Sequence, residues 1–265
     1  METELSEDMR GNIMDLKICY LEEDLFPKNM TSYEERPYGI LFYNTENKDS
    51  YDSNHAVIYR DKIEDLPTVL QEIVDFYKGK GTNAIIYQSM LDDGYFETIK
   101  EELSAAGFKS WSEEQKYMLP LAENEIVPSQ NVKVRKLTGW DDSLRQIFLE
   151  AEEPWEIDVV KRSVKNEDAW LFVAYLDNKP VGILYGHANE HVCRGDYLLV
   201  SKKYRCIGAG RALFSAYVEW CKESGITNAY LWPDGDTAER IYYEGGYRLV
   251  EKRIAGRAVY NKCPH

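Results

Sequence analysis

The stretch Lys202-Lys-Tyr-Arg205-Cys-Ile-Gly208-Ala-Gly210-Arg-Ala-Leu213 joins an expected strand, 196–200, to an expected long helix, 212–224. Its two glycines let the backbone turn sharply and approach a ligand closely. The free N–H groups and the positive dipole end of a helix N-terminus favour an anion such as a pyrophosphate. The stretch also gathers four basic residues in a chain whose formal net charge is -14: Lys202, Lys203, Arg205 and Arg211. It therefore predicts an anion-binding loop.

Two common phosphate loops do not fit this stretch. A P-loop needs Gly-Lys-Ser/Thr, and no such sequence follows Gly210. A dinucleotide fingerprint needs the spacing G-x-G-x-x-G, which is also absent. The anion loop must therefore belong to another class of protein.

The surrounding sequence predicts a mixed α/β sheet with helices on both faces. Apolar alternation or short apolar runs indicate strands, and apolar residues at helical spacing indicate helices. The expected strands are 132–137, 169–176, 181–187, 196–200, 228–232, 248–254 and 257–261. The expected helices are 141–151, 157–166, 212–224 and 237–244. In the N-terminal half, strands are expected at 55–59, 83–88 and 108–119, and helices at 65–78 and 95–106.

An internal repeat indicates two copies of one fold. Val74–Ala84 and Val218–Ala229 both contain a helix end, a glycine stop and an Asn-Ala strand start. The polar, proline-bearing segment 122–131 is typical of an inter-domain linker. We therefore expect domains at 13–121 and 131–262, after a loose polar tail that ends near Asn12.

The anion loop resembles a known family signature. Arg205-x-x-Gly208-x-Gly210 is similar to the acyl-CoA motif of the GNAT superfamily of N-acetyltransferases, and Ala238-x-x-x-Tyr242-x-x-x-Gly246-Tyr247 resembles that family's second hallmark. The resemblance implies tandem GNAT-like folds, each a mixed, mostly antiparallel central sheet flanked by helices. In the N-terminal copy, Tyr59–Pro67 has no glycine where the loop should be, so that copy is expected to be degenerate.

The resemblance also implies roles for individual residues. Backbone N–H groups would hold the pyrophosphate of acetyl-CoA, the co-substrate, at Cys206, Ile207, Gly208, Ala209, Gly210 and Arg211. Backbone groups of Leu198, Leu199 and Val200 would bind the pantetheine arm as a short extra strand. Tyr242 stands where the family often keeps a general acid for the departing thiolate. Gly235 departs from the family, which often has Asn there.

The general base is left open by the sequence. The candidates are Asp196, Glu190, His191 and Asp234, and water can also relay the proton. The acceptor loop is expected between the first two helices, where Glu152, Glu153 and Trp155 would suit a cationic amine. A solvated acidic loop with Trp155 in the core explains the same residues equally well.

Composition restricts the partners. The acidic balance argues against nucleic acid, and the apolar runs are too short to span a membrane. Five cysteines without CxxC spacing argue against a disulfide framework and a zinc site, and His187 and His191 straddle a hairpin rather than a helix turn. We expect a cytoplasmic monomer or homodimer without a metal.

The sequence thus predicts an acetyl-CoA-dependent N-acetyltransferase that acts on a primary amine of a small molecule by direct attack in a ternary complex. Two alternatives remain at this point. One is a non-catalytic acyl-CoA-binding regulatory module, and the other is a scaffold protein.

Overall fold

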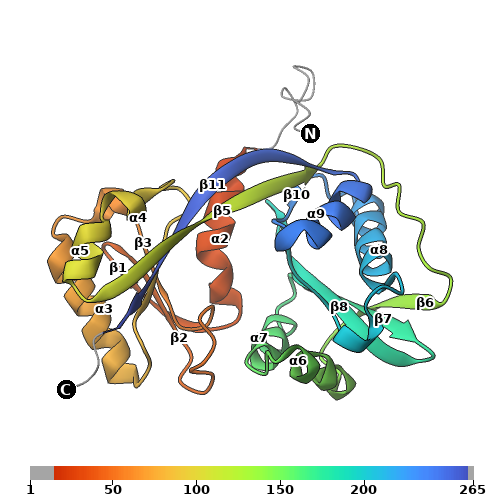
Figure 1. The fold of residues 1–265 in the computed structure, drawn as a ribbon, viewed down its shortest axis with the longest axis horizontal. Coiled ribbons are helices and arrows are strands. Elements are labelled where there is room, and N and C mark those ends of the chain that lie inside the picture. The colour runs from red at the N-terminus through yellow and green to blue at the C-terminus, as the bar shows by residue number, and fades with distance from the viewer. Residues whose placement is uncertain (1–14, 262–265) are drawn as a thin grey trace. The chain divides into compact units, whose positions relative to one another are not determined.

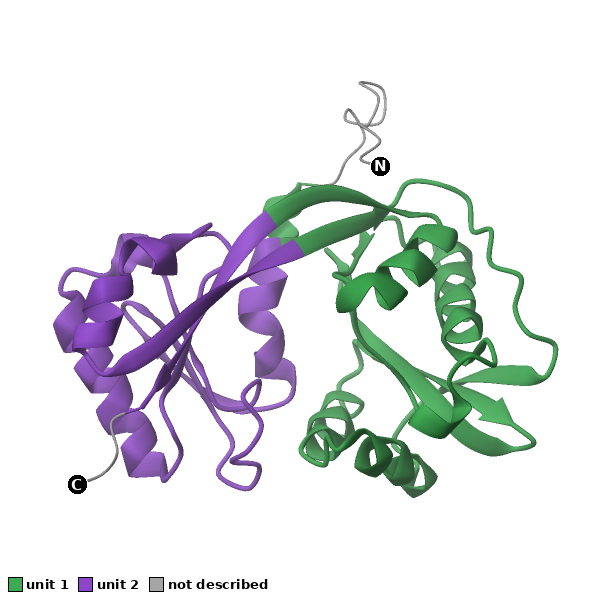
Figure 2. Cartoon of the chain, viewed as in Figure 1, with its two compact units in different colours: residues 1–19, 116–252 green, residues 20–115, 253–265 purple. Residues whose placement is uncertain are grey.

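The computed structural model describes residues 15–261, which fold into two compact units (Figures 1 and 2). The N-terminal unit takes in residues 20–115 and 253–265, and the C-terminal unit takes in 1–19 and 116–252. The expected polar tail, up to Asn12, lies outside the described residues. Among the helices of residues 15–261, none is long and apolar enough to cross a membrane.

The C-terminal unit is built on a five-stranded sheet in the order β10-β9-β8-β7-β6. Only β9 and β10 are parallel, and the other neighbours are antiparallel. The strands are β6 (Val132–Leu137), β7 (Ala169–Leu176), β8 (Lys179–Ala188), β9 (Cys193–Val200) and β10 (Ala229–Tyr230). All five lie where the sequence predicted strands.

Helices cover both faces of this sheet. Helices α6 (Arg145–Ala151) and α7 (Glu156–Ser163) pack on one face, and α8 (Ala209–Glu223) and α9 (Gly235–Glu244) pack on the other (Figure 1). Strand β7 explains how both faces become buried. Trp170 and Phe172 join the α8 core, whereas Leu171 and Val173 join the α6–α7 core. Such an unbroken apolar run is typical of a strand covered on both faces.

The N-terminal unit has a six-stranded sheet in the order β1-β2-β3-β4-β11-β5. Its strands are β1 (Ser32–Arg36), β2 (Gly39–Tyr43), β3 (Ala56–Ile58), β4 (Ile85–Gln88), β11 (Tyr247–Tyr260) and β5 (Phe108–Pro120). Its helices are α2 (Leu16–Leu25), α3 (Leu66–Lys80), α4 (Tyr95–Thr98) and α5 (Lys100–Ala105), with 3-10 turns η1 (Phe26–Asn29) and η2 (Arg60–Lys62). The sequence analysis missed α2, β1 and β2.

The two expected final strands, 248–254 and 257–261, are one continuous strand, β11. The prediction of two separate strands was wrong because Gly256 does not turn the chain. A Cβ at Gly256 would lie 2.5 Å from both Gln88 and Phe96, so this glycine allows close packing. The end of β11 pairs with β4 and belongs to the N-terminal unit. The units therefore are not the two continuous ranges 13–121 and 131–262.

The internal repeat is visible in the structure as the same order of helices and strands in both units. Strand β3, η2, α3 and β4 correspond to β9, η4 (Lys202–Tyr204), α8 and β10, and each set encloses a parallel strand pair. Gly81 and Gly225, which follow the two long helices, have left-handed φ values of 70° and 68°. Gly107 and Gly246 also match, with φ values of 91° and 90°.

The segment 121–131 carries no helix or strand, as the sequence predicted, but it belongs to the C-terminal unit. The backbone N–H groups of Leu121 and Ala122 donate to the carbonyl of Gly246, and that of Glu125 donates to the carbonyl of Glu244. These bonds attach the segment to the end of α9.

His55 is buried in the N-terminal unit, where its ring stacks on Tyr87 with ring centroids 4.2 Å apart. Burial, together with the charge of Arg257, lowers the pKa of His55 to about 4, against a smaller opposing effect of the Tyr51 carbonyl. The unfolded chain therefore binds a proton at higher pH than the folded chain. Stability present above pH 6.5 should be lost as the pH falls toward 4.

We expect His55→Gln to flatten the dependence of the unfolding free energy on pH between 6.5 and 4, by up to about 1.4 kcal/mol per pH unit. Urea denaturation at a series of pH values measures this slope. His191→Gln is the control, because the His191 side chain is 68% exposed. Equal slopes for wild type and His55→Gln would contradict the assignment.

Candidate active site

The loop before α8 presents backbone N–H groups that donate a hydrogen bond to no acceptor within residues 15–261. Cys206 and Gly208 have left-handed φ values of 64° and 88°, so the chain turns sharply twice before the helix begins. Gly208 is the N-cap of α8 and no side chain caps the helix. After Arg205, the first backbone N–H that donates a hydrogen bond is that of Ala212, and its acceptor is the carbonyl of Gly208. The N–H groups from Cys206 to Arg211 are therefore available to a ligand.

Both glycines of the loop lie in tight surroundings. A Cβ at Gly208 would be 3.1 Å from the Cβ of Ser129, and its φ disfavours any side chain. A Cβ at Gly210 would be 3.3 Å from Ile241. Gly208 is thus required by conformation, and Gly210 by the close approach of α9.

The basic side chains of the loop differ in whether a carboxylate of the protein already pairs with them. The Arg211 guanidinium donates two hydrogen bonds to Glu244, at 2.5 and 2.7 Å, and this pairing lowers the pKa of Glu244. Arg211 therefore offers a ligand its backbone N–H, not its charge. The exposed Arg205 donates through Nε to the carbonyl of Val200 at 3.3 Å. Lys202 and Lys203 are also exposed.

Strand β9 has an open edge next to this loop. It pairs with β10 only through Cys193 and Arg194 and then continues to Val200, while Leu231 pairs instead with Met118. The backbone N–H of Ser201 donates to the carbonyl of Val181, so the backbone polar groups of Ser201 point toward β8. These groups alternate in direction along a strand, so those of Leu199, two residues earlier, also point toward β8. The N–H and carbonyl groups of Leu198 and Val200 consequently face the open edge.

The N-terminal copy has no such edge. Strands β3 and β4 pair along the whole of β3, and the N–H of Ser89 donates to the carbonyl of Ile58 just beyond it. Asp24 is buried beside the end of β4, where it accepts from the Ser89 hydroxyl and, at 3.0 Å, from the N–H of Met90. Burial raises the pKa of Asp24 to about 7. A closed edge and a loop without glycine leave this copy no place for a similar ligand.

Tyr242 lies on the face of α9 that packs on α8, with its ring centroid 4.6 Å from that of Phe214. Burial, followed by the carboxylates of Asp234 and Asp196, raises the pKa of its hydroxyl well above the usual value. The phenol is therefore protonated at neutral pH. Because both carboxylates act on the hydroxyl, the hydroxyl lies near Asp234, which follows β10, and near Asp196 in the middle of β9.

Asp196 occupies a β-bulge of β9. Gly195 pairs with Gly186 and Tyr197 pairs with Tyr185, so Asp196 has no opposite residue on β8. Its Oδ1 forms an ion pair with Nη1 of Arg194, whose side chain is 7% exposed. The sequence analysis did not single out Arg194, although its position two residues before Asp196 on the strand was a usable signal.

The acceptor loop between α6 and α7 contains Glu152, Glu153 and Trp155. Glu152 is exposed and ends α6 with a left-handed φ of 66°. Oε2 of Glu153 is buried without a hydrogen-bond partner among residues 15–261. Burial and the charge of Asp234 raise the pKa of Glu153, and Lys202 and Arg205 oppose this effect. Glu153 thus lies near both Asp234 and the basic loop, whereas Trp155 is half-buried at the start of α7.

The other candidate groups are not brought together. His191 and Glu190 form an exposed pair at the turn between β8 and β9, and His187 is buried within β8. Cys206 is exposed in the loop. Within residues 15–261, no three His, Cys, Asp or Glu side chains are grouped so as to hold a metal ion.

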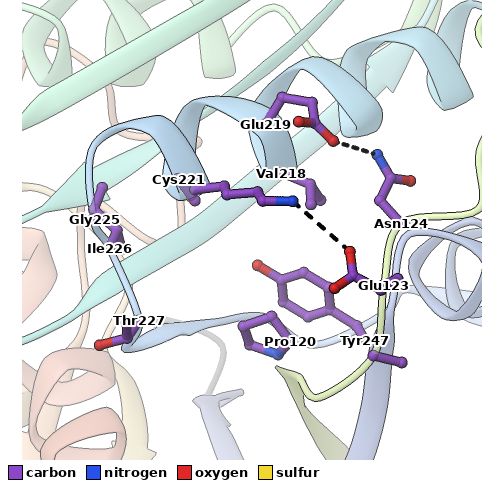
Figure 3. Close-up of a pocket in the computed structure, with 12 residues that line it drawn as sticks. Pro120, Glu123, Asn124, Val218, Glu219, Cys221, Gly225, Ile226, Thr227 and Tyr247 are labelled. Carbon is purple, nitrogen blue, oxygen red and sulfur yellow. Dashed lines mark hydrogen bonds and ion pairs between the residues drawn. The ribbon is translucent and has the colours of Figure 1, made fainter.

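A separate hollow of about 320 Å³ lies along the second half of α8, beyond the loop (Figure 3). Val218, Cys221 and Ile226 line it on one side, and Pro120 and Tyr247 line it on the other. Nζ of Lys222, which also lines the hollow, is 3.8 Å from Oε2 of Glu123. The hollow carries two carboxylates and one lysine, so its charge does not favour a phosphate.

Comparison with known proteins identifies the C-terminal unit. Residues 137–247 match the model of the acetyltransferase (GNAT) family. This range contains the loop, the open edge of β9, Tyr242 and the acceptor loop. No curated protein matches the chain.

Solved structures extend the fold over almost the whole chain. A GCN5-related N-acetyltransferase from Kribbella flavida is 15% identical, with a TM-score of 0.66 over 95% of this chain and 97% of that chain. A GCN5-related N-acetyltransferase-like protein from Streptococcus suis is 14% identical, with a TM-score of 0.54 over 95% and 98%. A tandem GNAT protein from the clavulanic acid biosynthesis pathway is 10% identical, with a TM-score of 0.54 over 79% and 76%. Residues 137–247 therefore constitute a GNAT acetyltransferase domain, which makes this part of the chain an acyltransferase, and the chain as a whole has the fold of two GNAT-like units in tandem.

Proposed function

We propose that the C-terminal unit transfers an acetyl group from acetyl-CoA to a primary amine of a small molecule, by direct attack in a ternary complex. The observation that carries the proposal is the continuity of the open β9 edge with the free N–H groups before α8. One end of this surface suits an extended amide-bearing chain, and the other suits a pyrophosphate.

The N–H groups from Cys206 to Arg211 hold the pyrophosphate, with Arg205 adding positive charge from the loop. The pantetheine arm lies beside β9 and exchanges hydrogen bonds with Leu198 and Val200, as an added strand would. The proposal leaves out Leu199, because its backbone is directed at β8. An N–H at the open edge, that of Leu198, then polarises the thioester carbonyl.

The acceptor amine reacts only after it loses a proton, which passes to Asp196 directly or through water. The neutral nitrogen then attacks the thioester carbonyl carbon. A C–N bond forms, the C–S bond breaks, and the sulfur leaves as a thiolate. The protonated hydroxyl of Tyr242 gives the thiolate its proton. The nitrogen of the product amide releases its second proton to solvent, and the Tyr242 phenolate regains a proton from solvent.

The acceptor loop favours a cationic amine. A buried carboxylate oxygen without a partner is costly, and an ammonium group of the acceptor satisfies it. Oε2 of Glu153 is such an oxygen, and the nearby Asp234 adds negative charge. Glu152 and Trp155 form the rest of the acceptor loop.

A non-catalytic acyl-CoA-binding module would use the same loop and edge. It would have no use for a buried, protonated phenol next to two carboxylates. Turnover, not binding, separates the two functions.

We expect Tyr242→Phe to lower kcat about a hundredfold or more, because the thiolate loses its proton donor. Binding of acetyl-CoA should be unchanged, since the loop and the β9 edge are untouched. The measurement is release of free CoA thiol with a panel of amines: spermidine, tyramine, glycine and an aminoglycoside. Isothermal titration with acetyl-CoA gives the binding constant.

Tyr243→Phe is the matched control, because Tyr243 is 52% exposed and stacks under Arg248 with 3.8 Å between the guanidinium carbon and the ring centroid. Equal kcat values for Tyr242→Phe and wild type would remove Tyr242 from the mechanism. Saturable acetyl-CoA binding without turnover of any amine by the wild type would favour the non-catalytic module.

Glu153→Gln should raise KM for cationic amines about tenfold or more, since a charged hydrogen bond is lost. KM for acetyl-CoA should stay the same. Steady-state kinetics with spermidine and tyramine measure both constants, and Glu152→Gln, at the exposed neighbour, is the control. The same change of KM in both variants would show a general charge effect rather than a contact with Glu153.

A further inference from the structure

A buried ion pair lies within β9, the strand that carries the open edge. The side chains of Arg194 and Asp196 are 7% and 16% exposed, and Nη1 of Arg194 contacts Oδ1 of Asp196. Burying two charges is expensive, and apolar residues of similar volume often stabilise a fold as well as such a pair does. The pair is therefore weakly explained by stability alone.

The titratable groups next to Asp196, on β8 and α9, are uncharged at neutral pH, so Arg194 is its positively charged partner. His187 pairs with Arg194 across β8 and β9 and is 1% exposed. Burial, together with the charge of Arg194, lowers the pKa of His187 to about 4, so this imidazole is neutral at neutral pH. From α9, the neighbour of Asp196 is the protonated hydroxyl of Tyr242.

The two ring nitrogens of His187 have no hydrogen-bond partner within residues 15–261. The imidazole thus does not compete with Arg194 for the carboxylate. Arg194 takes Oδ1 of Asp196, which leaves Oδ2 outside the ion pair.

We propose that Arg194 is a positioning residue that holds the Asp196 side chain in the β9 bulge through Oδ1, with Oδ2 left to take the proton of the acceptor amine. The inference rests on the proposed acetyl transfer. It assigns a role in that reaction to a residue that contacts neither substrate. His187 maintains the arrangement by staying neutral beside the guanidinium.

The test compares Arg194→Met with Arg194→Lys, using the amine of the panel that the wild type turns over fastest. Arg194→Met should lower kcat at least tenfold and leave KM for acetyl-CoA within about twofold of wild type. A loss of kcat with an unchanged KM for acetyl-CoA separates the positioning of the base from damage to the acetyl-CoA site. Arg194→Lys keeps a cation beside the carboxylate and should restore part of kcat.

A purely structural role predicts a different pattern. The two variants would then lose kcat by the same factor, or Arg194→Met would retain the wild-type kcat, and either result overturns the proposal. The double variant Arg194→Met/Asp196→Asn leaves no unpaired buried charge, so it serves if Arg194→Met does not fold. It should be no slower than Asp196→Asn alone, because the two residues act as a unit. A slower double variant contradicts the proposal.

Failure of the inference is distinguishable from failure of the proposed function. A wild type that binds acetyl-CoA but acetylates no amine of the panel removes the function on which the inference rests. An active wild type whose kcat does not respond to Arg194→Met removes the inference and leaves the acetyl transfer standing.

Discussion

The early separation of β9 from β10 is the constraint on which the proposed site depends. The two strands pair through Cys193 and Arg194 only, so beyond that point the backbone groups of β9 that face away from β8 have no strand beside them among residues 15–261. An unpaired edge of this kind normally invites another chain. Here it ends at the Gly208 turn and the N-terminus of α8, which is a surface for an extended ligand with an anionic end. The parallel pair in the other unit stays closed, and its loop has no glycine.

Polar groups of the C-terminal unit divide into those that stabilise the fold and those left to a ligand. Arg211 is held by Glu244 and Asp196 is paired with Arg194. In the proposed function, the N–H groups after Arg205, Oε2 of Glu153 and the hydroxyl of Tyr242 act on the substrates. In the proposed reaction, the paired charges orient the site and the remaining groups bind or transfer protons.

The sequence predicted the C-terminal sheet well, because strands such as β7 are apolar on both faces and because Gly208, Gly225 and Gly246 stand where the chain turns. It failed at Gly256, where a glycine serves close packing inside β11 instead of a turn. It also missed β1, whose residues are largely exposed and charged, so no apolar alternation marked it. Within the site, the loop and Tyr242 were found by motif. The ion pair of Arg194 and the loss of the Arg211 charge to Glu244 depend on contacts that no local pattern encodes.

Hydrogen exchange of the wild-type protein with and without acetyl-CoA tests the central claim most directly. Bound acetyl-CoA should slow exchange in peptides that cover 196–214, because the N–H groups of Leu198, Val200 and the loop gain acceptors. Gly208→Ala should abolish this protection at the same ligand concentration, since its φ and the contact with Ser129 reshape the loop. Unchanged exchange at 196–214 under saturating acetyl-CoA, or protection confined to 56–66 of the N-terminal unit, would contradict the account.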